Sequence, residues 1–198
     1  MSIVRRLAII GRNFIDGIAT PPRLMWEQRG LLRLLIRREM VGRTSGTSLG
    51  SAWMLVQPAL QMLGMWFFLV IVLQVRSPGR VPFVNYFLVG MVAWTMLSEI
   101  LQRNLTVMVE FGALYQRTIF PLPLLPLLPL LVSGAIYGTV LVVVAAVLEG
   151  PFAAAGAACG ILLLLIWLVP ISYGLAVLGL FVREARQVVP FALTMLMY

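Results

Sequence analysis

The chain lacks lysine and histidine altogether, so all fifteen of its basic residues are arginine. Without lysine it cannot carry the standard P-loop, in which a lysine contacts the phosphates of ATP, nor a Schiff-base site. Without histidine it cannot build a serine-protease triad, a Cys-His pair or an HExxH zinc site. Its single cysteine, Cys159, cannot form an intrachain disulfide. We therefore expect a chain that is not an enzyme and that binds no metal and no cofactor of its own.

Charged residues are also scarce, at 11% of the 198 positions, against about 25% in a typical soluble domain. Hydrophobic residues make up 61%, and the mean hydropathy is +1.00. A soluble fold of this size would not have enough polar side chains to cover its core. The composition therefore predicts an all-α, polytopic helical membrane protein. Because the net charge of +8 comes from arginines that flank apolar stretches, it indicates anionic membrane lipids rather than nucleic acid as partners.

Residues 1–48 are expected to form an amphipathic, interfacial region on the cytoplasmic side of the membrane. Scattered arginines interrupt the apolar core that a secretory signal would need. Between positions 22 and 41, leucines lie opposite Arg29, Arg33 and Arg37, which are spaced four residues apart. This pattern predicts a helix that lies in the membrane plane with its arginines toward the headgroups. A helix packed on a partner protein is the alternative.

Residues 49–198 are expected to form the transmembrane domain, because four stretches are long and apolar enough to cross a bilayer. The last stretch, 191–198, is apolar but too short to cross, which indicates the truncated start of a fifth span and a chain that is a fragment. Pro170 is expected to kink the fourth span. The four full spans are predicted at 49–75, 83–101, 126–148 and 153–181.

The arginines also predict which side of the membrane each loop faces. Nine of them precede the first predicted span, two lie in 103–120 and two in 182–189, whereas Arg76 and Arg80 lie in the loop after the first span. With the N-terminus in the cytoplasm, thirteen arginines are inside and two outside, which is the bias expected of cytoplasmic loops. The sequence therefore predicts a multi-pass protein of the cytoplasmic (inner) membrane with a cytoplasmic N-terminus.

Polar and aromatic side chains within the first two spans are candidates for a conduit. Gln57 and Gln61 stand one turn apart, and lipid cannot satisfy their amides, so we expect them to face another helix or a wet pathway. Aromatic residues in these spans fit interfacial belts, or stacking on sugar rings inside a conduit. Hydrogen bonding between helices is the simpler alternative for the glutamines. The possible conduit lining comprises Gln57, Gln61, Trp66, Tyr86 and Trp94.

Two further patterns concern helix packing. Glu99 lies near the cytoplasmic end of the second predicted span with Arg103 four residues on, which predicts an ion pair rather than a proton relay. The GxxxG patterns at 134–138 and 156–160 predict close helix contacts.

Three segments, taken together and in order, carry a resemblance to a known family. The first, 37–58, contains Arg-Arg-Glu followed by a Leu-Gly pair, Trp53 and a Gln-Pro pair; the second, 90–121, contains Gly90, Trp94 and a Phe-Pro pair. The third, 183–190, reads Arg-Glu-Ala-Arg-Gln and ends at a proline. These segments resemble the permeases of ABC-2-type polysaccharide exporters, which serve O-antigen, capsule and teichoic acid. Ala93 and Gln116 depart from this pattern, since the family commonly has proline and a basic residue at these positions.

The resemblance implies a half-transporter, in which two permease chains form the conduit and a dimer of separate ABC ATPase subunits holds ATP and magnesium. It implies a cytoplasmic coupling segment at 104–121. Arginine suits phosphate oxygens, so Arg29, Arg33 and Arg37 are candidates for guiding the lipid-linked phosphate headgroup of a glycan. The implied contacts with the ATPase are Glu110, Tyr115, Arg117, Phe120 and Pro121.

The expected function is therefore that of the permease subunit of an ATP-driven exporter that moves a lipid-linked polysaccharide across the cytoplasmic membrane. One alternative is an ABC-2 permease for drugs or lipids. Another is a membrane scaffold or assembly protein with no transport role.

Overall fold

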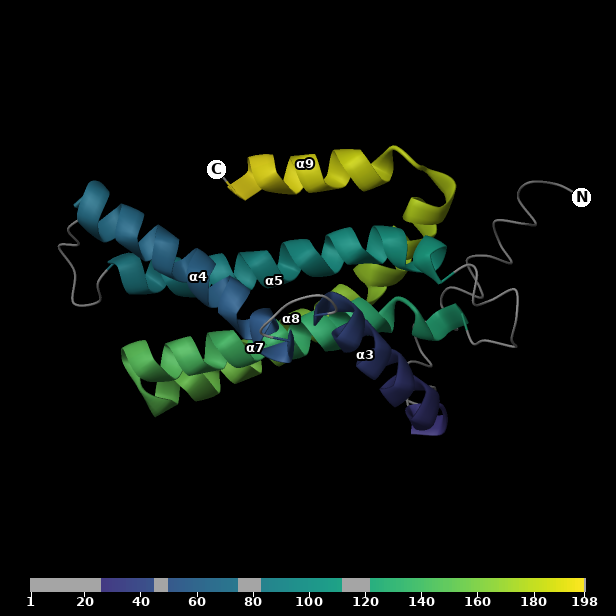
Figure 1. Cartoon of the computed structure of the whole chain (residues 1–198), viewed down its shortest axis with the longest axis horizontal. Coiled ribbons are helices and arrows are strands. Elements are labelled where there is room, and N and C mark those ends of the chain that lie inside the picture. Colours follow the sequence, from purple (N-terminus) through teal and green to yellow (C-terminus); the bar gives the residue numbers. More distant parts are fainter. Residues whose placement is uncertain (1–25, 45–49, 75–82, 112–121, 198) are drawn as a thin grey trace, which may run out of the picture.

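The computed structural model describes residues 26–44, 50–74, 83–111 and 122–197 (Figure 1). Every regular element within these ranges is helical, which confirms the predicted all-α class. The elements are α3 (Arg29–Thr44), η1 (Gly50–Ala52), α4 (Trp53–Phe67), η2 (Phe68–Val72), α5 (Phe83–Glu110), η3 (Leu122–Leu124), α7 (Leu127–Glu149), α8 (Pro151–Phe181) and α9 (Ala185–Met197).

Three helical stretches among the described residues are long and apolar enough to cross a membrane: Trp53–Val72, Leu122–Glu149 and Pro151–Phe181. They coincide with the first, third and fourth predicted spans. The second predicted span, 83–101, is the first part of α5, which continues without a break to Glu110 and is not in this apolar set. That this part of α5 also crosses the membrane stays a prediction.

The end of the chain also differs from the prediction. Residues 182–189 were expected to be a short charged segment, with an apolar helix starting only after Pro190. Instead α9 begins at Ala185 and includes Pro190. A proline within the first two turns of a helix removes one backbone hydrogen bond, which this helix accommodates. Pro58 and Pro170 likewise lie inside α4 and α8.

The core lies where α5, α7 and α8 pack together. α7 and α8 run side by side and are joined at Gly150, whose φ of 94° favours glycine (Figure 1). Gly134 and Gly138 face the Leu165 and Ile161 side chains of α8, as the first GxxxG pattern predicts. The second pattern makes no close helix contact in the described part of this chain, since a Cβ added at either of the two glycines, 156 and 160, would have no atom of another helix within 4 Å.

The closest approach between helices occurs between α5 and α8, at Gly179. A Cβ added at this glycine would collide with the backbone of Leu105, so no other residue fits without moving a helix. The carbonyl of Gly179 also accepts hydrogen bonds from the Arg186 guanidinium, at 3.0 Å from Nε and 2.6 Å from Nη2. About two turns of α8 before this crossing, Ser172 accepts a 3.1 Å hydrogen bond from the buried Asn104 amide.

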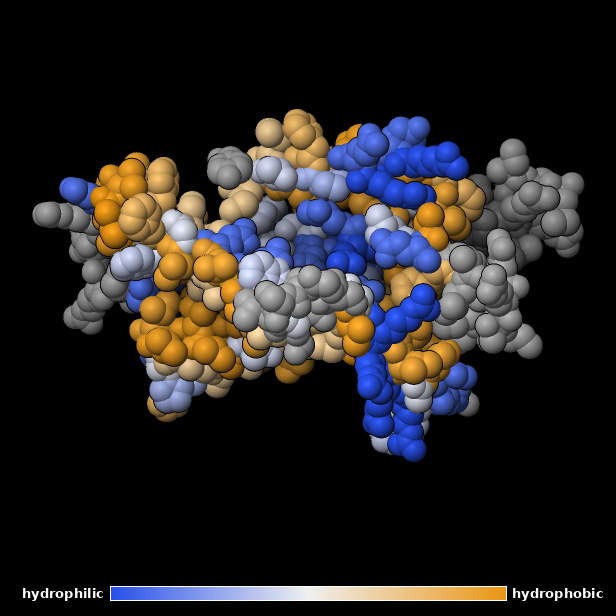
Figure 2. Space-filling view, viewed as in Figure 1, coloured by the Kyte–Doolittle hydropathy of each residue, from blue (hydrophilic) through white to orange (hydrophobic). Residues whose placement is uncertain are grey.

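Among the described residues, α3, α4 and α9 lie outside this three-helix core. α4 crosses α5 and α7 and diverges from them along its length, whereas α3 lies at an angle across one end of the bundle (Figure 1). Figure 2 shows that the surface over α3 is strongly hydrophilic, while the far ends of α7 and α8 are hydrophobic. On the face shown, hydrophilic surface is thus concentrated toward the α3 side of the molecule.

Candidate functional site

A cluster of four charged side chains lies where α3 meets the bundle. We call Glu39, Arg43, Glu99 and Arg103 the Arg–Glu cluster. Glu39 and Arg43 are one turn apart on α3, and Glu99 and Arg103 are one turn apart on α5, so each helix presents its pair on one face. Arg43 donates to Glu39 at 3.1 Å and to Glu99 at 2.6 Å, and Arg103 donates to Glu39 at 2.9 Å. The two helices are therefore joined by crossed ion pairs.

A third helix joins the cluster through Ser133 of α7. Its hydroxyl accepts a 3.1 Å hydrogen bond from the Arg43 guanidinium and donates one of 3.1 Å to Glu99. Ser133 is fully buried, and the Tyr137 hydroxyl one turn further along α7 also interacts with Glu99. Glu99 thus receives hydrogen bonds from α3 and α7 as well as the charge of Arg103 on its own helix.

The cluster is partly shielded from the surroundings and balanced in charge. The side-chain exposure is 10% for Arg43, 14% for Glu39, 23% for Glu99 and 36% for Arg103. Charges at this depth are costly unless they are paired, and here two carboxylates face two guanidinium groups. The predicted Glu99–Arg103 ion pair is present at 3.8 Å, but the shorter contact of Glu99 is with Arg43, 56 residues away in the chain.

A polar cavity of about 290 Å³ opens beside the Arg–Glu cluster. Gln57 of α4 lines it, together with Gln102 of α5 and Tyr137 of α7. The cavity therefore receives amide, phenol, carboxylate and guanidinium groups from four helices. Figure 2 shows a recessed hydrophilic area in this part of the molecule, between α3 and α9. Gln57 is the one predicted conduit residue that the structure places beside the charge cluster.

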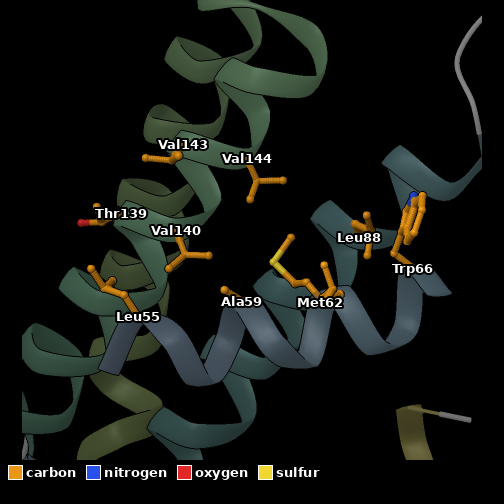
Figure 3. Close-up of a pocket in the computed structure, with 10 residues that line it drawn as sticks. Leu55, Ala59, Met62, Trp66, Leu88, Thr139, Val140, Val143 and Val144 are labelled. Carbon is orange, nitrogen blue, oxygen red and sulfur yellow. The ribbon is translucent and has the colours of Figure 1, made fainter. Parts of the chain in front are cut away.

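A second cavity, of about 570 Å³, lies between α4 and α7 and is almost entirely apolar. Figure 3 shows Leu55, Ala59 and Met62 of α4 pointing toward α7 across this groove, with Trp66 at one end. Four residues of α7 form the opposite wall: Thr139, Val140, Val143 and Val144. We call this cavity the α4–α7 groove.

The remaining predicted conduit residues lie elsewhere. Gln61 lines a cavity of about 10 Å³ next to Pro58 and Thr95, which is too small for more than one water molecule. Tyr86 and Trp94 line a cavity of about 280 Å³ against the end of α9. The five residues proposed to line one conduit are thus distributed over four cavities of this chain.

The three arginines predicted to face headgroups, Arg29, Arg33 and Arg37, are all exposed on α3. They form the arginine stripe, which contributes to the hydrophilic surface in Figure 2. The neighbouring Arg38 lies over the ring of Phe111, 5.6 Å from its centre, so the C-terminal end of α5 is in contact with α3. The stripe and the end of α5 therefore lie at the same end of the molecule.

Of the predicted ATPase contacts, Glu110 is exposed in the last turn of α5. The other four, Tyr115, Arg117, Phe120 and Pro121, lie outside the described residues.

The chain is similar to the O-antigen export system permease protein RfbA of Myxococcus xanthus. The two are 28% identical over 104 residues, which are 52% of this chain and 39% of that relative. The match thus spans well under half of the relative's length. No family model and no solved structure matches the chain. Together with the three long apolar helices, this similarity supports a membrane transport permease.

Sequence reasoning missed the Arg–Glu cluster as a unit. Its i,i+4 pairs are visible in the sequence, but nothing in their spacing says that the pair on α3 faces the pair on α5. One signal was available. Glu99 lies at the edge of an apolar span, where a carboxylate needs a partner of opposite charge. Within 29–44, Glu39 is the only acidic residue, and Arg43 follows it by four residues, which is one helical turn. Gly179 gave no signal, because it belongs to no GxxxG pattern.

Proposed function

We propose that this chain is the permease subunit of an ATP-driven exporter that moves a lipid-linked polysaccharide across the cytoplasmic membrane. The observation that carries the proposal is the similarity to an O-antigen export permease, in a chain with three helices long enough to cross a bilayer. The chain has no lysine and hence no standard P-loop, so the proposal places ATP hydrolysis on a separate ATPase subunit. Two permease chains and two ATPase chains would form the working transporter.

The arginine stripe of α3 supports this assignment. Arg29, Arg33 and Arg37 present three exposed guanidinium groups along one helix, and guanidinium binds phosphate oxygens in a bidentate manner. The carrier lipid of such a glycan bears phosphate at the membrane surface. In the proposed transporter α3 lies at the cytoplasmic interface, where its stripe guides that phosphate toward the bundle.

The proposed coupling region is the segment 104–121. Its first turns are the end of α5, which contacts α3 through Phe111 and Arg38. In the proposal, Glu110, Arg117 and the adjacent aromatic residues enter a groove on the ATPase. The N-terminus, the end of α5 and the start of α9 then face the cytoplasm.

The experiment is reconstitution of the full-length permease with the ATPase encoded beside it, in vesicles that contain a lipid-linked glycan. We expect ATP hydrolysis that rises when the glycan lipid is present, and transfer of the glycan across the bilayer. Replacing both Glu110 and Arg117 by alanine should remove most of the stimulation but leave basal hydrolysis and insertion unchanged. A matched control is Glu149→Ala, at the last residue of α7 and away from the proposed coupling region. Stimulation by a drug or by plain phospholipid, but not by glycan lipid, would contradict the proposal.

A further inference from the structure

The α4–α7 groove and the polar cavity adjoin each other along both helices that form them. On α4, Leu55 lines the groove and its neighbour Met54 lines the polar cavity. On α7, Val140 lines the groove and Ile136, one turn earlier, lines the polar cavity. The two cavities thus have lining residues next to each other on both helices, and together they present a polar end and an apolar length.

The groove offers almost no polar group to an occupant. Its one hydroxyl, on Thr139, donates a 2.7 Å hydrogen bond to the carbonyl of Ala135 and is thereby satisfied within α7. The walls remain open to the surroundings, with Leu63 63% exposed and Val143 54% exposed. An apolar surface of this kind in a membrane-spanning segment binds hydrocarbon.

The length of the groove matches one leaflet of a bilayer. It runs along α4 from Leu55 to Trp66, which is about 16 Å at the helical rise of about 1.5 Å per residue. Half of a hydrocarbon core of about 30 Å is about 15 Å. The groove is therefore long enough for one acyl chain of a lipid in that leaflet.

The polar cavity indicates which headgroup accompanies that chain. Arg43, Glu99 and Arg103 line the cavity, and Glu39, which is not part of the lining, is bonded to both arginines, so the four charges of the Arg–Glu cluster balance. Arg103, at 36% exposure, offers donors to a phosphate, whereas Glu99 and the amides of Gln57 and Gln102 offer acceptors to an ammonium group. A balanced site of this kind favours a zwitterionic headgroup over an anionic one. The exposed arginine stripe of α3 has the opposite preference.

We propose that the α4–α7 groove and the polar cavity together bind one zwitterionic phospholipid of phosphatidylethanolamine type. Its headgroup lies in the polar cavity and one acyl chain lies along the groove, in the leaflet on the α3 side. This lipid fills the space that α4 leaves as it diverges from α7. The proposal concerns a bilayer lipid and does not depend on the exported substrate.

The test uses the full chain in nanodiscs made from equal parts of phosphatidylethanolamine and phosphatidylglycerol, followed by native mass spectrometry of the released protein. We expect one phosphatidylethanolamine to stay on each wild-type chain. Ala59→Phe fills the groove from α4 and Val143→Phe fills it from α7, and each should abolish the retained lipid. Ala155→Phe is the matched control: it makes the same change at an exposed position of α8 outside the groove, and its lipid should remain.

Three results would overturn the proposal. Retention of phosphatidylglycerol as readily as phosphatidylethanolamine would remove the headgroup assignment. Retention by both groove-filling variants, with helical content unchanged by circular dichroism, would show that the lipid lies elsewhere. In a variant that carries both Ala59→Cys and Cys159→Ser, efficient disulfide formation between two copies would show that a second copy covers the groove instead.

Discussion

Glu99 shows how a single carboxylate organises three helices. It accepts hydrogen bonds from Arg43 on α3 and Ser133 on α7, and it sits one turn from Arg103 on its own helix. A carboxylate in an apolar span is costly alone, and these contacts supply the compensating charge and donors. Its role in this chain is therefore to hold helices together rather than to carry protons.

This role predicts a stability defect when the pairing is removed. Glu99→Gln removes the negative charge that pairs with the partly buried Arg43 guanidinium, and we expect a loss of roughly 1–3 kcal/mol in the free energy of unfolding. Glu110→Gln, at an exposed end of α5, should change it by less than about 0.5 kcal/mol. Unfolding in detergent, followed by circular dichroism, measures both. Equal stability of the two variants would mean that the cluster does not hold α3 to the bundle.

Gly179 provides a second test at the scale of one residue. A methyl group there meets the Leu105 backbone, so Gly179→Ala must push α5 and α8 apart, at a cost of about 1–3 kcal/mol. Gly156→Ala lies on the same helix with open space around it and should be neutral or slightly stabilising, because alanine is the better helix former. Thermal unfolding of the two variants compares them directly. A neutral Gly179→Ala would contradict the close crossing.

At the scale of elements, the arginine stripe and the Arg–Glu cluster occupy one helix but have separate roles. α3 buries Leu32 and Leu35 against the bundle, presents its stripe to the outside and holds the cluster at its C-terminal end. Charge reversal of Arg29, Arg33 and Arg37 together should therefore leave folding intact while reducing export of a phosphate-bearing lipid substrate several-fold.

The measurement for this variant is glycan export in cells that lack the native permease, at matched protein levels. Arg183→Glu, near the start of α9, introduces a charge reversal outside the stripe and serves as the control. Unchanged export by the triple variant would exclude a role of the stripe in guiding the headgroup.

The elements differ in how far the sequence could predict them. α7 and α8 begin and end within two residues of the predicted spans, because Glu149 and Gly150 separate two long charge-free runs. α5 was predicted too short, since its charged residues suggested a loop, whereas they pair with α3 inside the structure. The ion pairs between α3 and α5 could not be predicted, because periodicity describes one helix at a time and these contacts join residues 56 and 64 positions apart.

At the scale of the whole molecule, the polar side chains gather toward the end where α3 lies, and the turn between α7 and α8 lies at the other end (Figures 1 and 2). This separation agrees with the predicted bias of arginines toward one side. It predicts the sidedness of chemical labelling.

In a Cys159→Ser background, Glu149→Cys should react with a membrane-impermeant maleimide added outside intact cells, because it lies beside the turn at Gly150. Glu110→Cys, in the last turn of α5, should react only after the membrane is permeabilised. The reverse pattern would invert the orientation, and labelling of both from one side would contradict the membrane arrangement of α7.

The Arg–Glu cluster also has a mechanical consequence. Arg43 and Glu39 connect α3 to α5, and Ser133 extends the connection to α7, so we expect these three helices to move together. α4 takes no part in these bonds and is the least buried of the three membrane-spanning stretches. In the proposed transporter, a push applied to α3 would therefore move α5 and α7 with it more than α4, and the width of the space between α4 and α7 would change.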